Sequence, residues 1–105
     1  MSGDVFKNIG AGAVIINRST LSHAMNAAGR TGGQETAAAI EQIARFIEES
    51  GSAEAAENFN AFNEELRRPA PRKSLLKSLW NGVVAALPAV ASLADATARI
   101  AALVH

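Results

Sequence analysis

Apolar side chains recur at helical spacing in the middle of this 105-residue chain. Two stretches, 34–49 and 52–66, place them every three or four residues, as an amphipathic helix does. The repeating positions are Ile40, Ile43, Ala44 and Ile47 in the first stretch and Ala55, Phe59, Phe62 and Leu66 in the second. The pattern predicts one helix over each stretch. The break at 50–52, Ser-Gly-Ser, supplies a stop and then a fresh N-cap.

The C-terminal third predicts two more helices. The fourth covers about 72–87, and the fifth begins at Pro88, because proline suits a first helical turn. Trp80 is expected in the core between them. The two helices contain the uncharged stretch 78–94, which is near the lower limit of a membrane span. Since Pro88 divides this stretch, we favour a buried helical hairpin, with a membrane-active segment over 78–104 as the alternative.

The N-terminal residues have a different pattern. A Gly-Ala-Gly turn at 10–12 is followed at 13–16 by a run of apolar, mostly β-branched residues. This order is typical of a hairpin or a short buried strand. Because a lone hairpin is marginal in water, the segment must dock on the helices or pair with another copy.

A first short helix should follow this segment. Ser19 or Thr20 is expected to be its N-cap, and Gly29 its end. The predicted fold class is therefore mostly α: a small bundle of four to five helices with a short N-terminal β-hairpin or strand. Residues 1–18 form the extended segment, and residues 19–105 form one helical-bundle domain.

Composition refines this picture. Hydrophobic residues make up 49% of the chain, and 23 of these residues are alanine. Alanine favours helices and their close packing but buries little area. The chain has no cysteine, which excludes a disulfide scaffold and fits a reducing cytoplasm. Asp4 and Lys7 stand where a secretory signal would have a basic-then-apolar run, so we expect a cytoplasmic protein.

Candidate catalytic and cofactor motifs are weak. The stretch 9–14 matches the start of a dinucleotide-binding fingerprint, but Ile15 stands in place of the third glycine and the region of Arg30 is basic rather than acidic. His23 and His105 are the only histidines, too few for a zinc site. No carboxylate is placed to orient His23 for catalysis. We expect no enzyme, no cofactor and no metal.

Charge is distributed in two blocks along the chain. Between positions 35 and 65 there are eight acidic residues and one basic residue, and between 67 and 77 there are five basic residues and no acidic one. These blocks could be solvated faces, contacts with an acidic protein surface such as another copy, or sites for nucleic acid or anionic lipid. Nucleic acid is unlikely on this pattern, because a net basic domain with interleaved aromatics is missing.

Several short motifs resemble a known group of modules. These are 6–9, Phe-Lys-Asn-Ile; 14–19, Val-Ile-Ile-Asn-Arg-Ser; 75–80, Leu-Leu-Lys-Ser-Leu-Trp; and 87–90, Leu-Pro-Ala-Val. They resemble the effector-associated or death-like adaptor domains of bacterial conflict and antiphage defence systems. The resemblance implies a non-enzymatic module that recruits or clusters effectors through homotypic contacts. It supplies no catalytic residues. Classical death folds are six-helix bundles, and the extended N-terminal segment departs from them.

We therefore predict a self-associating adaptor whose partners are itself and a similar domain on an effector protein, with a membrane contact possible but not favoured. The predicted interaction residues fall in the N-terminal segment, the basic block and the acidic block. They are Val14, Ile15, Ile16, Asn17 and Arg18; Arg67, Arg68, Arg72 and Lys73; and Glu57, Glu64 and Glu65.

Overall fold

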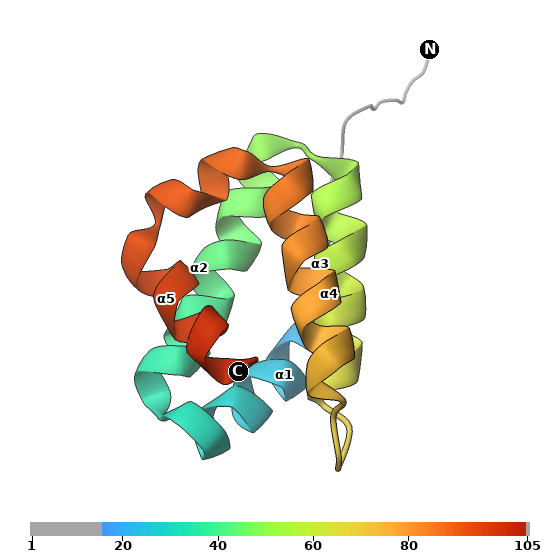
Figure 1. The fold of residues 1–105 in the computed structure, drawn as a ribbon, viewed down its shortest axis with the longest axis vertical. Coiled ribbons are helices and arrows are strands. Elements are labelled where there is room, and N and C mark those ends of the chain that lie inside the picture. The colour runs from blue at the N-terminus through green and yellow to red at the C-terminus, as the bar shows by residue number, and fades with distance from the viewer. Residues whose placement is uncertain (1–15, 105) are drawn as a thin grey trace.

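The computed structural model describes residues 16–104 (Figure 1). In this range the chain forms five α-helices and one 3-10 helix, with no strand. The elements are α1 (Arg18–Gly32), α2 (Gln34–Ser50), α3 (Ala53–Leu66), α4 (Lys73–Ala86), η1 (Pro88–Ser92) and α5 (Ala94–Leu103). The mostly helical bundle is confirmed. The hairpin prediction falls largely on residues outside the described range, and its last residues, from Arg18, are already helical.

Local hydrogen bonds explain where the first helices begin and end. The side chain of Asn17 accepts from the backbone N–H of Thr20 at 3.0 Å, so Asn17 is the N-cap in place of the expected Ser19 or Thr20. Consequently α1 starts at Arg18, and it runs past Gly29 to Gly32. Gly51 ends α2 with a left-handed φ of 75°, which glycine adopts without a steric penalty.

The C-terminal helices depart from the predicted hairpin. Pro88 opens the 3-10 helix η1, and α5 begins only at Ala94. α4 packs mainly on α3, whereas α5 packs mainly on α2, so the last two helices are not each other's main partner. None of the helices in the described range combines the length and the apolar character that crossing a bilayer requires.

The core is built from buried apolar side chains of all five α-helices and of η1. Trp80 is buried as predicted, with 6% of its surface exposed. Its aromatic partner is on α3, where Phe62 lies 6.3 Å away between ring centroids at a tilt of 55°. Phe62 in turn stacks on Phe59 at 6.0 Å. The other large apolar side chains with 2% or less of their surface exposed are Ile16, Ile40, Ile43, Ile47, Leu76, Val83, Val90 and Ile100.

Candidate interaction surface

The connection between α3 and α4, residues 67–72, is held in place by one buried carboxylate. Glu65, in the last turn of α3, is only 4% exposed. One of its oxygens accepts from the backbone N–H of Arg72 at 2.8 Å. The guanidinium Nε of Arg68 lies 3.3 Å from the other oxygen, and that of Arg72 lies 3.6 Å from the first. Glu65 therefore joins both ends of the connection.

These contacts also set the protonation behaviour of Glu65. The backbone hydrogen bond from Arg72 is the largest effect and lowers the pKa of Glu65 below its ordinary value of 4.5. The charges of Arg68 and Arg72 act in the same direction, and burial opposes them. Glu65 thus stays ionised at neutral pH, where it can hold both arginines.

Glu64 is also used within the chain. It accepts a hydrogen bond from the hydroxyl of Thr20 at 3.3 Å, and its other oxygen lies 4.0 Å from Arg67. The sequence places Glu64 and Glu65 in the acidic block, but in space they belong with the arginines that follow them. Glu65 is buried, so it cannot be part of an exposed acidic face, whereas Glu64 keeps 60% of its side-chain surface exposed.

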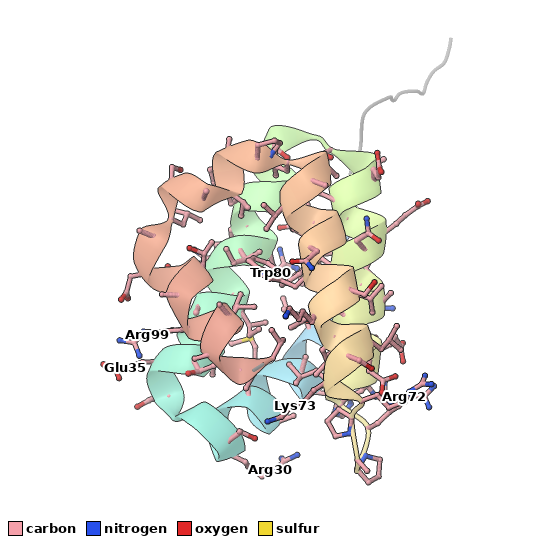
Figure 2. The ribbon with its side chains drawn as sticks, viewed as in Figure 1. Arg30, Glu35, Arg72, Lys73, Trp80 and Arg99 are labelled. Atoms are coloured by element: carbon pink, nitrogen blue, oxygen red, sulfur yellow. The ribbon has the colours of Figure 1, made fainter. Side chains whose placement is uncertain are left out.

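Six exposed cations nevertheless gather at one end of the bundle. Figure 2 shows Arg30, Arg72 and Lys73 at the end where the α1–α2 turn and the α3–α4 connection lie. Arg67 and Arg68 belong to that same connection. Lys77 follows one turn into α4. We call these six residues, Arg30, Arg67, Arg68, Arg72, Lys73 and Lys77, the basic end; all of them are exposed.

Three exposed glutamates lie at the other end of the long axis. Glu49 is in the last turn of α2, and Glu54 and Glu57 are in the first turns of α3. The turn between these helices is opposite the α3–α4 connection (Figure 1). Within residues 16–104 no ion pair joins these three side chains to another residue. We call Glu49, Glu54 and Glu57 the acidic end.

The predicted N-terminal contact residues are occupied inside the chain where the structure describes them. Ile16 is 2% exposed and joins the core. Asn17 caps α1, and its backbone N–H donates to the side-chain oxygen of Asn60 at 2.9 Å. Arg18 forms an ion pair with Glu48. Ile16 is therefore covered by this chain's own helices. Val14 and Ile15 lie outside the described residues.

Two surface hollows are relevant to binding. The larger, about 360 Å³, is lined by Thr31, Gly32, Thr36, Lys73, Arg99, Ala102 and Leu103. Its guanidinium, Arg99, lies 3.4 Å from Glu35 and 3.3 Å from Asp95, and a cation neutralised in this way is a weak anchor for an anion (Figure 2). The smaller, about 220 Å³, lies beside the acidic end and is lined by Gln42, Arg45, Phe46, Glu49 and Leu93.

The potential metal ligands and the two histidines are the remaining candidate site residues. No three potential ligands among histidine, cysteine, aspartate and glutamate come together there to hold a metal ion. His23 is exposed on α1, and His105 lies outside the described range. Comparison with protein-family models, with curated proteins and with solved structures finds no match to this chain.

Proposed function

We propose that this chain is a non-enzymatic protein-interaction module that associates with copies of itself head to tail. The observation that carries the proposal is the separation of its exposed charges. The basic end and the acidic end lie at opposite ends of the helical bundle (Figures 1 and 2). Complementary patches of this kind steer encounters and suppress wrong partners.

The intrachain ion pairs leave charge available at both ends. At the basic end three arginines, Arg67, Arg68 and Arg72, pair with only two glutamates, Glu64 and Glu65, so a net positive charge remains. Arg67, Arg68 and Arg72 keep between 43% and 67% of their side-chain surface exposed. The Arg67–Glu64 pair, at 4.0 Å, is exposed on both sides, and a pair of this kind contributes about 0–1 kcal/mol, so Arg67 can exchange Glu64 for another carboxylate at little cost.

Opposed ends favour one kind of assembly. Two acidic ends repel, and so do two basic ends, so an isologous dimer through either end is disfavoured. Contact of an acidic end with a basic end is heterologous, and it builds rings or open filaments. A chain that assembles in this way would bring together the domains fused to it and the proteins bound to it. The resemblance to effector-associated and death-like adaptor domains points to the same role, with a similar domain on an effector as second partner.

The experiment is sedimentation velocity of the protein at about 0.1 M and about 1 M NaCl, between which the Debye length falls from about 10 Å to about 3 Å. We expect assemblies at the lower salt and a shift towards the 10.9 kDa monomer at the higher salt. Glu49→Lys should weaken assembly at the lower salt. Glu35→Lys, in the first turn of α2 and at the opposite end of that helix, is the matched control and should not weaken assembly. A monomer at both salts, or assembly that ignores salt and Glu49→Lys, would overturn the proposal.

A further inference from the structure

We propose that the tip of the α3–α4 connection, Pro69 and Ala70, docks into the groove beside Phe46 and Leu93 of the next copy. This inference rests on the head-to-tail association proposed above and names the two surfaces that meet. One surface protrudes and the other is hollow, and each lies at the end of the bundle where the required charge is found.

The protruding surface is exposed and held in one shape. Figure 1 shows the connection extending beyond the ends of α3 and α4. Pro69 and Ala70 are exposed at its tip. Proline has a fixed φ, and Glu65 holds Arg68 and Arg72 on either side of the tip. A segment ordered in advance loses little conformational entropy on binding, which favours affinity.

The hollow surface is mainly apolar. Phe46 of α2 and Leu93, which precedes α5, are half-buried and pack against the core, and both line the groove of about 220 Å³. Since one water takes up roughly 30 Å³, the groove has room for several waters that these two side chains cannot hydrogen-bond. Releasing such water to a proline or alanine side chain is favourable.

Charges around the two surfaces match. Glu49 lines the groove, and Arg67 and Arg68 stand next to the protruding tip. The groove also has one cation, Arg45, but its guanidinium already bonds to Glu41 at 3.0 Å. Docking would therefore bring arginines towards Glu49 while Arg45 keeps its own carboxylate.

The occupant must be a second copy rather than the same chain. The groove lies near the end of α2, whereas the tip of the connection extends past the opposite end of the bundle (Figure 1). No movement that preserves α3 and α4 lets the tip reach its own groove. Because one copy gives its tip and receives another tip in its groove, the contact repeats from copy to copy.

The absence of cysteine from this chain allows a direct test by crosslinking. Ala70→Cys copies are mixed with Gln42→Cys copies under oxidising conditions, and mixed disulfide dimers are followed on non-reducing gels. A disulfide forms only when the two Cα atoms approach within about 7 Å. The control mixes Ala70→Cys with Ala61→Cys, which is exposed on α3 and away from the groove. All three positions are exposed, so the variants should fold.

We expect the 70–42 pair to crosslink about tenfold faster than the 70–61 pair, because docked cysteines meet at effective concentrations of order millimolar. Ala70→Glu should abolish assembly, since it brings a carboxylate to Glu49. Equal crosslinking rates, or assembly that survives Ala70→Glu, would overturn the docking of the tip while leaving head-to-tail association in place. An unmodified chain that stays monomeric would overturn both.

Discussion

Asn63 occupies a core position of α3 with a buried amide. The side chain is 0% exposed, and among residues 16–104 neither its oxygen nor its nitrogen has a hydrogen-bond partner. Phe59 and Leu66 stand about one turn away on the same buried face. We predict that Asn63→Leu stabilises the fold, because leucine has the same number and branching of side-chain heavy atoms but no polar group to satisfy.

The size of the effect follows from two opposed contributions. An unsatisfied buried polar group costs about 1–3 kcal/mol, and leucine removes this penalty. The two methyl groups are bulkier than the amide atoms, and overpacking in a closely packed core offsets part of the gain. The expected net gain is about 1 kcal/mol, which for a domain of this length raises the Tm by about 4–8 °C.

Urea unfolding followed by circular dichroism measures the gain as a higher midpoint at an unchanged m-value. Asn63→Asp, which keeps the shape and adds a charge, is the matched control and should destabilise strongly because a buried unpaired charge is costly. If Asn63→Leu lowered stability by 1 kcal/mol or more, the amide would have a hydrogen-bond partner in the folded protein. The reasoning above would then be refuted.

Substitutions at three other positions test separate parts of the fold. Trp80→Ala should cost about 3–5 kcal/mol by urea unfolding, whereas Trp80→Phe should retain most of that stability; an unchanged midpoint for the alanine variant would show that Trp80 is outside the core. Glu65→Gln should lower the Tm at pH 7, and the difference from the unmodified chain should shrink as the pH falls below 4.5. The sign follows from the lowered pKa of Glu65, because Glu65 takes up its proton more readily in the unfolded chain than in the folded one. The stability that ionised Glu65 supplies is therefore present above the ordinary pKa, and it is lost as the pH falls through the pKa of Glu65 in the folded protein. A difference that did not shrink at all as the pH falls would count against this. Gly51→Ala should cost about 1 kcal/mol because of the left-handed φ, and Gly51→Asn should cost less; equal stability of all three chains by urea unfolding would contradict the cap.

Helical periodicity predicted where the helices lie better than it predicted which helices pack against each other. The apolar spacing in 34–49 and 52–66 corresponds to α2 and α3, because each helix buries one continuous face. The N-terminal cap was misplaced by two to three residues, since Asn17, Ser19 and Thr20 are all good caps and only the fold selects among them. The packing of α4 on α3 and of α5 on α2 is a tertiary choice that periodicity does not encode.

The charge blocks show the same limit at the candidate surface. Arg67 and Arg68 follow Glu64 and Glu65 by three residues, a spacing at which helical side chains form ion pairs. The sequence alone could therefore have predicted these two pairs. The bond from Arg72 to Glu65 was not available, because it depends on the chain turning back at 67–72. Likewise, Arg30 joins the basic end only because the α1–α2 turn folds to that end.

The central claim is that one copy's acidic end binds the next copy's basic end, and two charge-reversed chains test it most directly. Glu49→Lys with Glu57→Lys makes both ends basic, and Arg67→Glu with Lys77→Glu cancels the positive charge of the basic end and leaves only the acidic end charged, while Glu65 and its two arginines stay intact. Sedimentation velocity at about 0.1 M NaCl should find each double variant near the 10.9 kDa monomer when alone and larger assemblies when the two are mixed. A mixture that sediments as two monomers, or either variant assembling alone like the unmodified chain, would contradict it.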